Sequence, residues 1–199
     1  MAEGAQEDYA RLEIQTPLAR EVLAELVADP IALLRINPLL EFQEVRVQGP
    51  DHWHLVLKHL GRDRLFELDA RRQPLADGGW RLSWSGWLKQ ATEVHLEEGP
   101  EGARLVLIDD YSGLDEQTRK ARLDEVDNSL NHWGHALYRY FRNWKRWSWL
   151  PGWKWYFRGP WLKMKPSARR ISFMLLVVTA MEFVLFLFAI VILKLELHS

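Results

Sequence analysis

The sequence contains no cysteine among its 199 residues. Disulfide bonds, thiolate nucleophiles and cysteine metal ligands are therefore excluded. The sequence also has no Gly-x-Ser-x-Gly nucleophile motif, no phosphate-binding glycine loop and no dinucleotide-binding fingerprint. These absences favour a binding or structural role over an enzymatic one, and we predict no catalytic residue and no cofactor.

A metal centre has little support either. The seven histidines include His52 and His54 on one expected strand, and His132 and His135 three residues apart on an expected helix. A zinc site needs three or four ligands that are held by second-layer hydrogen bonds, and no His-Glu-x-x-His spacing occurs. Because His52 and His54 lie opposite Trp53 on the strand, we expect them to face solvent. We therefore predict no metal.

Several carboxylates fall on expected strands, where they could serve acid–base catalysis. That chemistry needs perturbed pKa values in a cleft that excludes water. The exterior of a sheet is commonly charged, so we interpret these carboxylates as solvated. They are Glu44, Glu67, Asp69, Asp109 and Asp110.

Acidic residues are missing from one long segment. Residues 138–170 hold ten Lys and Arg and no Asp or Glu, whereas residues 1–137 hold 25 acidic and 15 basic residues. We call residues 148–170 the collar. Tryptophan concentrates where membrane meets water, and Pro151–Gly152 and Gly159–Pro160 break the collar into short pieces that suit such an interface. We predict contact with membrane lipids at Trp144, Trp147, Trp149, Trp153, Trp155, Trp161, Lys163, Lys165, Arg169 and Arg170.

Interleaved basic and aromatic residues can also bind RNA or a partner protein. The collar directly precedes a long apolar run, and this position favours a membrane surface. We therefore predict no nucleic-acid binding, and a protein-docking surface stays as the alternative.

The apolar run covers residues 171–193 and has Glu182 as its single ionisable side chain. A helix of 23 residues is roughly 35 Å long, enough for a hydrocarbon core of about 30 Å. We predict a transmembrane helix. The alternative is a buried core helix, but it would need a large domain around it, and only six residues follow the run.

The charges on the two sides of the run predict its orientation. Four basic residues precede it within residues 163–170, and Lys194 follows it. The positive-inside rule then places residues 1–170 in the cytoplasm and the short tail, residues 194–199, on the other side. The first thirty residues contain no apolar segment of a cleavable signal peptide. We expect a single-pass, tail-anchored protein of a bacterial inner membrane.

Glu182 lies near the middle of the predicted span. A charge there costs about 2.5–3.5 kcal/mol on insertion scales, and such residues usually face a partner or a cavity. We expect Glu182 to contact an integral membrane protein. The alternative is a carboxyl group that bonds within its own helix, near Thr179 one turn back.

Residues 9–147 show alternating and helical apolar patterns, whereas the small polar residues 1–8 predict a flexible tail. Asp29–Pro30 and Asn37–Pro38 end two short helices. Ser112 and Asp115 resemble a capping box before a long helix. The expected order is a strand, two helices, six strands and a helix, at residues 9–16, 18–29, 31–36, 42–48, 52–59, 64–70, 79–87, 93–98, 103–109 and about 112–147.

The expected long helix carries one apolar stripe, which must face a sheet or a cavity. Its members recur at spacings of three and four residues. They are Leu123, Val126, Leu130, Trp133, Leu137, Tyr140, Phe141 and Trp144.

This order of elements resembles the START-like superfamily, also called SRPBCC, which includes polyketide cyclases, the birch-pollen allergen and lipid-transfer domains. The local likeness lies in Leu12–Pro17, Asp29–Pro30 and Arg35–Pro38, and it covers about residues 9–145. The resemblance implies an α+β helix-grip fold, in which a seven-stranded antiparallel sheet wraps a long helix and encloses a hydrophobic pocket.

Two functions follow from this resemblance and the predicted span, and a cyclase-like enzyme stays as a third alternative that rests on family analogy alone. The first is a membrane-anchored protein that binds a lipid or another hydrophobic small molecule at the cytoplasmic surface. The second is an accessory subunit of a larger membrane complex. In that case the domain of residues 9–147, which we call the head, is packed and holds no ligand. The residues expected to line the pocket, or else to fill the core, are Trp53, Leu55, Leu57, Phe66, Trp80, Leu82, Trp84, Trp133 and Leu137.

Overall fold

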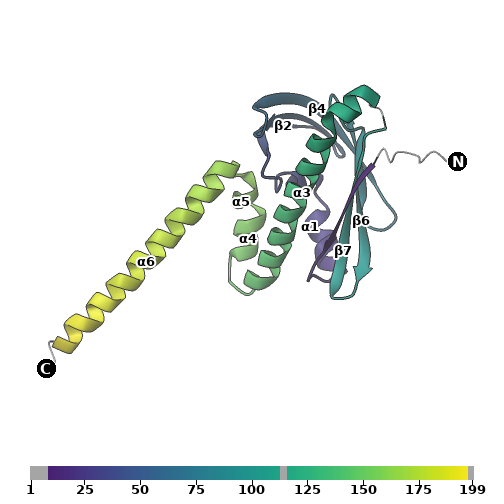
Figure 1. Cartoon of the computed structure of the whole chain (residues 1–199). Helices are drawn as coiled ribbons and strands as arrows, with labels where there is room; N and C mark the ends of the chain where they lie inside the picture. Colours follow the sequence, from purple (N-terminus) through teal and green to yellow (C-terminus); the bar gives the residue numbers. More distant parts are fainter. Residues whose placement is uncertain (1–8, 113–115, 197–199) are drawn as a thin grey trace. The chain divides into compact units, whose positions relative to one another are not determined.

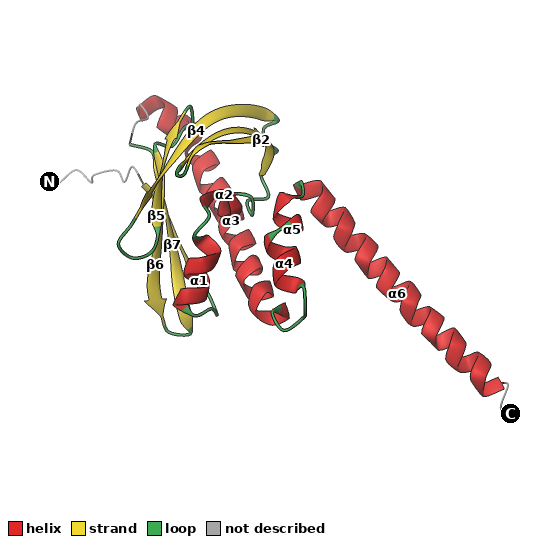
Figure 2. Ribbon diagram, turned by 180° about the vertical axis from the view of Figure 1, so that it is seen from behind, coloured by secondary structure: helices red, strands yellow, loops and turns green. Residues whose placement is uncertain are grey.

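Seven antiparallel strands form one sheet in the order β1-β7-β6-β5-β4-β3-β2 (Figure 2). The computed structural model describes residues 9–112 and 116–196, with side chains described for residues 9–112 and 130–195. Each strand from β2 to β6 pairs with the next one in the sequence, and β1 lies at the edge of the sheet beside β7. The strands are β1 Tyr9–Gln15, β2 Leu40–Gly49, β3 His52–His59, β4 Arg64–Pro74, β5 Trp80–Ser85, β6 Ala91–Gly99 and β7 Gly102–Asp110.

Two short helices, α1 (Arg20–Val27) and α2 (Pro30–Leu34), connect β1 to β2, and the long helix α3 (Glu116–Trp147) follows β7. Figure 1 and Figure 2 both show α3 lying in the hollow of the curved sheet. The helix-grip α+β fold predicted from the sequence is therefore confirmed.

The predicted apolar stripe of α3 faces the sheet. Its members from Leu130 to Trp144 are at most 6% exposed. Leu123 and Val126 lie outside the described side chains, and the predicted capping partner Asp115 and the predicted tail 1–8 lie outside the described residues.

Two buried indoles tie the short helices to the rest of the core. Trp80 Nε1, on β5, donates a hydrogen bond to the Val27 carbonyl oxygen at the end of α1 (2.7 Å). Trp133 Nε1, on α3, donates to the carbonyl oxygen of Leu33 in α2 (3.2 Å). A buried indole N–H needs such an acceptor. The sheet and the long helix therefore both hold the connection between β1 and β2.

The break between the two short helices forms as predicted. Asp29 precedes α2, and its Oδ1 accepts hydrogen bonds from the backbone N–H groups of Ile31 (2.9 Å) and Ala32 (3.2 Å). Pro30 occupies the first turn, where a missing N–H has no cost. This N-cap stops α1 and starts α2.

The chain divides into two compact units, Met1–Lys163 and Met164–Ser199. The first unit includes part of the collar, as the short helices α4 (Trp153–Arg158) and α5 (Pro160–Lys163). Phe157 of α4 stacks on Tyr140 of α3, with ring centroids 4.6 Å apart. The first half of the collar therefore packs against the C-terminal half of α3.

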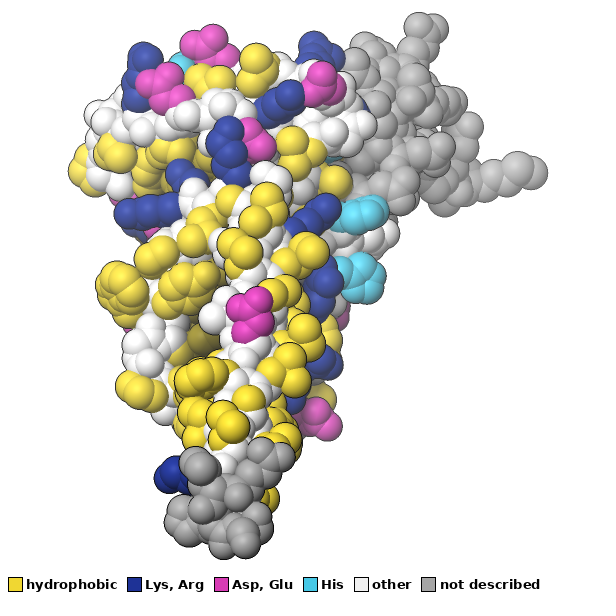
Figure 3. Space-filling view, turned by 90° about the vertical axis from the view of Figure 1, so that its left-hand side faces the viewer, with side chains coloured by type: hydrophobic (Ala, Val, Ile, Leu, Met, Phe, Trp, Pro, Cys, Tyr) yellow, Lys and Arg dark blue, Asp and Glu magenta, His cyan; other side chains and the backbone are white. Residues whose placement is uncertain are grey.

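The second unit contains one long helix, α6 (Pro166–Glu196). Within Pro166–Leu195, the most apolar 18 residues have a mean hydropathy of 2.8 and none of them is buried. Figure 3 shows hydrophobic side chains on the surface along this helix. Within the described residues this is the one helix that is long and apolar enough to cross a membrane.

Candidate functional site: a cavity beside a buried lysine

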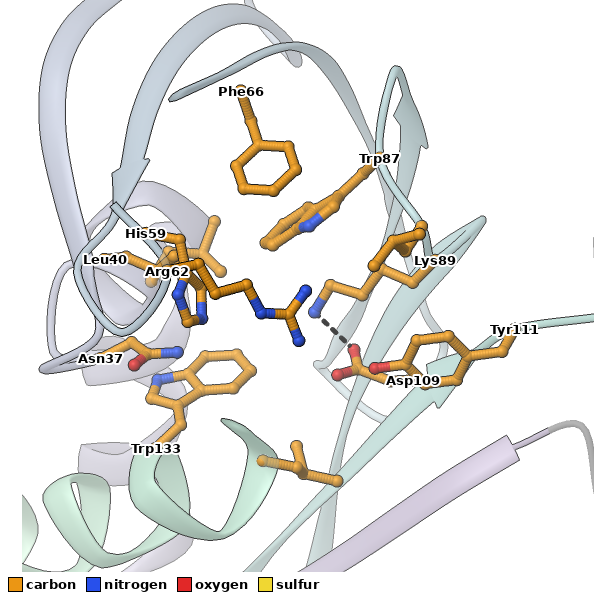
Figure 4. A pocket seen from close by; sticks show the side chains of 13 residues that line it. Asn37, Leu40, His59, Arg62, Phe66, Trp87, Lys89, Asp109, Tyr111 and Trp133 are labelled. Carbon is orange, nitrogen blue, oxygen red and sulfur yellow. Dashed lines mark hydrogen bonds and ion pairs between the residues drawn. The ribbon is translucent and has the colours of Figure 1, made fainter. Parts of the chain in front are cut away.

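A small cavity lies between α2, α3 and the ends of several strands (Figure 4). It holds about 50 Å³, which is room for a few water molecules. Small-molecule pockets usually measure about 300–1,000 Å³. The lining residues are aromatic (Phe66, Trp87, Tyr111, Trp133), ionisable (His59, Arg62, Lys89, Asp109), or aliphatic and amide (Leu34, Asn37, Leu40, Leu88, Leu130).

A buried ion pair forms one wall of the cavity. Lys89 Nζ lies 2.8 Å from Asp109 Oδ1, and the two side chains are only 8% and 5% exposed. The Lys89 ammonium also lies 4.6 Å from the ring centre of Trp87 and 5.7 Å from that of Trp133. Aromatic faces attract a cation at these distances, most strongly where water is excluded. One carboxylate and the surrounding indoles therefore fix the position of the Lys89 side chain in the cavity wall.

The sheet supplies the other partners of this ion pair. Thr92 on β6 is paired with Asp109 on β7 in the strand register. The Thr92 hydroxyl donates a hydrogen bond to Asp109 Oδ1 (2.5 Å), and Trp84 Nε1 donates to Thr92 Oγ1 (3.1 Å). All of these groups are buried, so the network is satisfied internally rather than by bulk water.

Backbone bonds hold the loop that carries Lys89. This loop runs between β5 and β6, and Trp84 N donates to Gln90 O while Gln90 N donates to Asp110 O, both at 2.8 Å. The rings of Trp84 and Trp87 meet edge to face at 4.6 Å. The loop is thus fixed at both ends, and the lysine enters the cavity wall from a defined position.

Two cations point into the same space. In Figure 4 the Arg62 guanidinium, from the turn between β3 and β4, extends toward the Lys89 ammonium above the Trp133 ring. The lining thus holds two basic side chains, Lys89 and Arg62, and one carboxylate, that of Asp109. An anionic group combined with a flat or apolar body would suit such a wall, because it could meet the cations and the indoles together.

The interpretation of the strand carboxylates as solvated is wrong for two of the five. Asp109 and Asp110 are 3% and 5% exposed. Asp109 pairs with Lys89, and Asp110 Oδ2 lies 3.4 Å from Arg81 Nη2. Both aspartates lie at the C-terminal end of β7, which is paired with a strand on each side. Because side chains alternate along a strand, the two carboxylates lie on opposite faces of the sheet. Each face buries its carboxylate against a cation.

The histidines expected to face solvent are partly covered. The His54 side chain is 15% exposed, with Nδ1 3.3 Å from Asp69 Oδ1, and His52 is 28% exposed. His132 and His135 are exposed on α3. Across the described residues, no three His, Cys, Asp or Glu side chains are placed to hold a metal ion.

The structure brings only two of the nine expected pocket residues, Phe66 and Trp133, to the cavity. Trp84 lies behind it, with its ring centre 5.7 Å from the Lys89 ammonium, and Trp53 packs against the core while half-buried. As ligand contacts, all nine stay predictions. The remaining five, each at most 2% exposed inside the core, are Leu55, Leu57, Trp80, Leu82 and Leu137.

Sequence reasoning missed Lys89, Trp87 and Arg62, which form most of the polar wall. Apolar periodicity selects residues inside strands and helices, whereas these three lie in connections. A lysine that directly follows two apolar residues, Trp87 and Leu88, is a weak signal of a partly buried position. Nothing in the local sequence indicates its partner Asp109, which is 20 residues away.

The predicted membrane-contact residues divide by exposure. Trp149 and Trp155 are 72% and 73% exposed, whereas Trp144 is 5% exposed. Trp147, Trp153 and Trp161 are half-buried; Lys163, Lys165 and Arg170 are exposed, and Arg169 is half-buried. Glu182, the predicted partner contact, is exposed on α6. The roles of these residues stay predictions.

No protein-family model and no curated protein matches the sequence. Several solved structures have a similar fold. A protein from Rhodobacter sphaeroides is 15% identical, with a TM-score of 0.49 over 67% of this chain and 92% of that one. The Zhui aromatase/cyclase from Streptomyces sp. R1128 is 13% identical, with a TM-score of 0.48 over 66% and 88%. Ara h 8.0201 is 12% identical, with a TM-score of 0.45 over 68% and 97%. At TM-scores below 0.5 these likenesses carry no argument about function, and the fold rests on the strand order and the long helix.

Proposed function

We propose that this chain is a membrane-anchored helix-grip protein whose head binds a small amphipathic anion in the cavity beside Lys89. The observation that supports it is the composition of the cavity wall, where two cations and several aromatic rings meet within one lining. A core that only had to be filled would be more stable with apolar residues, because removing charges from water is costly. A ligand that meets the two basic side chains would account for the presence of these charges.

The expected binding mode follows from the wall. The carboxylate or phosphate of the ligand meets Lys89 and Arg62, and its apolar part lies against Trp87, Trp133 and Phe66. The present volume of about 50 Å³ is too small for a ligand of ordinary size. Binding therefore requires the outer wall to open, and the turn that carries Arg62 is the exposed part of that wall, since its neighbours Leu60 and Leu65 are 40% and 61% exposed.

The anchor gives the head its access to such ligands. In this proposal the span of residues 171–193 keeps the head at the membrane surface, and the four basic residues within 163–170 favour a cytoplasmic head at a bacterial inner membrane. Amphipathic anions partition into the bilayer surface. A tethered head thus meets them at a higher concentration than a free protein would.

Binding is tested with the full chain in nanodiscs and two dansyl-labelled probes, a fatty acid and the fatty alcohol of equal length. We expect saturable binding of the acid and clearly weaker binding of the alcohol. Phe66→Trp should fill the cavity and abolish binding. Leu65→Trp adds the same ring at a neighbouring exposed position and should leave binding intact. Equal binding of acid and alcohol, or no saturable binding, would exclude the proposal.

The anchor is tested separately by deleting residues 171–199. The truncated chain should be released from membranes by high salt or alkaline carbonate, since only surface contacts remain. The full chain should stay in the membrane pellet. If the full chain is also released, no span exists.

The accessory-subunit function is the second candidate. It is favoured by the small volume of the cavity, which leaves the head nearly filled. In that case Glu182 and the collar dock the chain onto a larger membrane complex, and neither probe binds.

A further inference from the structure

The tryptophans in and next to the collar fall into two groups, one packed against other aromatic rings and one exposed. One group belongs to an aromatic stack that joins α4 and α5 and continues onto Tyr140 of α3: the ring centres of Phe157 and Trp161 are 4.7 Å apart, and those of Trp153 and Phe157 are 4.8 Å apart. These rings stabilise the fold of the head. Trp149 and Trp155 take no part in the stack and are 72% and 73% exposed. Exposed indoles of this size are unusual on a surface that faces only water.

An open groove of about 480 Å³ lies beside Trp155, between α1, the end of α3 and α4. The buried ring of Trp144 lines it from α3, and Lys154, Trp155 and Arg158 line it from α4. Val22 of α1 adds an apolar side chain that is 36% exposed. The groove therefore combines an apolar floor with basic side chains.

One contact fixes the shape of this groove. The Arg158 guanidinium forms an ion pair with the Glu25 carboxylate of α1, and its second nitrogen donates to the Glu25 carbonyl oxygen (3.3 Å). This contact ties α4 to α1 across the groove and neutralises the one acidic side chain of the lining. Lys154, which is exposed, then leaves the lining with a net positive charge.

We propose that this groove and the two exposed indoles form a docking surface for a bilayer that contains anionic phospholipid. Lys154 attracts the headgroup phosphates, and Trp149 and Trp155 enter the interfacial layer, which suits an indole with an apolar ring and a polar N–H. The sequence supports a bilayer as the occupant. Residues 138–170 hold ten basic and no acidic residues, and α6 begins at Pro166, three residues after α5 ends at Lys163. The inference rests on the anchoring part of the proposed function and is independent of the ligand cavity.

The absence of cysteine permits one reporter at a time in the full chain. Trp149→Cys and Trp155→Cys carry an NBD label on the docking surface. Val47→Cys, on β2 and 71% exposed, is the matched control away from it. Each protein is reconstituted in vesicles of phosphatidylcholine alone, or of phosphatidylcholine with about one-fifth phosphatidylglycerol. The readouts are the NBD emission maximum and the rate of label reduction by aqueous dithionite.

We expect the labels at 149 and 155 to shift to shorter wavelength and to react more slowly in the anionic vesicles, while the label at 47 reacts equally in both. Lys154→Gln should partly reverse the shift at 155. Arg71→Gln removes the same charge from an exposed position on β4 and should not. Labels at 149 and 155 that react as fast as the label at 47 would overturn the proposal and favour a protein partner. Equal protection in both kinds of vesicle would overturn the role of anionic lipid.

Failure of the anchor is distinguishable from failure of the docking surface. Alkaline carbonate extraction of the same vesicles reports on the span, whereas the labels report on the surface before extraction. If the chain is extracted, the anchoring proposal fails and the label data still decide the docking surface. If the chain resists extraction and both labels stay in water, only the docking surface is wrong.

Discussion

The Lys89 ammonium and the Asp109 carboxylate lie 2.8 Å apart, with both side chains more than nine-tenths buried. Such a pair gains strong mutual attraction, but each charge has lost its water, and removing one partner leaves the other uncompensated. The hydrogen bond that the Thr92 hydroxyl donates to Asp109 Oδ1 (2.5 Å) replaces only part of the hydration that the carboxylate has lost. The stability of the head should therefore depend strongly on this pair.

Lys89→Met keeps the side-chain length and removes the charge. We expect it to lower the free energy of unfolding by about 3–5 kcal/mol, because Asp109 then remains buried without its cation. The double variant Lys89→Met with Asp109→Asn should recover a large part of this loss. Urea unfolding of the full chain in detergent, followed by circular dichroism, measures both. Lys58→Met is the control, since its partner Asp63 is 84% exposed, so the loss of this ion pair should change the free energy of unfolding far less.

The packing of the core around β5 is tested by Leu82→Trp. Leu82 is fully buried, between Arg72 of β4 and Thr92 of β6 in the strand register. The larger ring has no space, so we expect a loss of about 1–3 kcal/mol, as is usual for an overpacked core, and a lower melting temperature. Leu65→Trp, at a site that is 61% exposed, should change little. An unchanged melting temperature for Leu82→Trp would reveal space in the interior and favour the nine pocket residues predicted from the sequence.

Patterns within single elements predicted the fold well. Leu55 and Leu57 alternate on β3 and are fully buried, and the Asp29–Pro30 break became an N-cap between two helices. These features depend on neighbours in the sequence, because alternation and helical spacing decide which face is buried. The order of such elements was then sufficient to indicate the helix-grip arrangement.

Contacts between distant loops could not be predicted in the same way. The Lys89–Asp109 pair depends on the register of β6 and β7 and on the path of the β5–β6 loop, neither of which alternation reveals. The collar shows a second limit. Its tryptophans suit both a membrane interface and a packed aromatic stack, and composition cannot separate the two. Gly152, with φ of +78°, allows the turn after α3 that brings Phe157 back onto Tyr140.

The turn between β4 and β5 needs glycine at position 79. A β carbon there would lie 1.8 Å from the Val94 carbonyl oxygen, a backbone atom of the neighbouring strand. Gly79→Ala must therefore push β5 away from β6 next to the Trp80–Val94 pair, and we expect a marked drop in melting temperature. Gly49→Ala is the matched control, since its nearest neighbour would be the His52 β carbon at 3.8 Å, an ordinary contact. Equal melting temperatures for the two variants would contradict this account.

His95 on β6 links the β4–β5 turn to the sheet. Its Nδ1 lies 2.8 Å from Asp77 Oδ2 and its Nε2 lies 3.1 Å from Glu93 Oε2. Burial lowers the pKa of His95, but hydrogen bonds and charges of Glu93 and Asp77 outweigh burial, so the pKa is raised above 6.5. Burial likewise raises the pKa of Asp77, and hydrogen bonds from Gly79, His95 and Leu96 outweigh it, so that pKa is lowered.

The sign of the pH dependence follows from the raised pKa of His95. The protonated ring stabilises the folded state fully below about pH 6.5, the pKa of an unfolded histidine, and the contribution is lost as pH rises through the folded pKa. We expect the melting temperature to fall from pH 6 toward pH 8, by an amount that corresponds to less than about 1 kcal/mol for a partly exposed pair. His95→Gln should flatten this slope, whereas His135→Gln, on the exposed face of α3, should not. A slope that persists in His95→Gln would assign the effect to another group.

Glu182 decides between the two candidate functions. It is the one ionisable side chain in residues 171–193, eleven residues from either end, and it is exposed on α6. If the carboxyl group bonds only within its own helix, both Glu182→Gln and Glu182→Leu should insert and behave as the wild type. If it contacts a membrane partner, as in the accessory-subunit function, Glu182→Leu should insert as well or better, because a costly group is removed, and should lose the partner. Glu182→Gln should lose the partner partly if the contact is a hydrogen bond, and fully if the contact depends on the negative charge.

The measurement is the recovery of co-purifying proteins in mild detergent, by mass spectrometry at matched expression, with Thr179→Val as a control on the neighbouring turn. Unchanged recovery in Glu182→Leu would remove this residue from the docking role and leave the ligand-binding function as the stronger one.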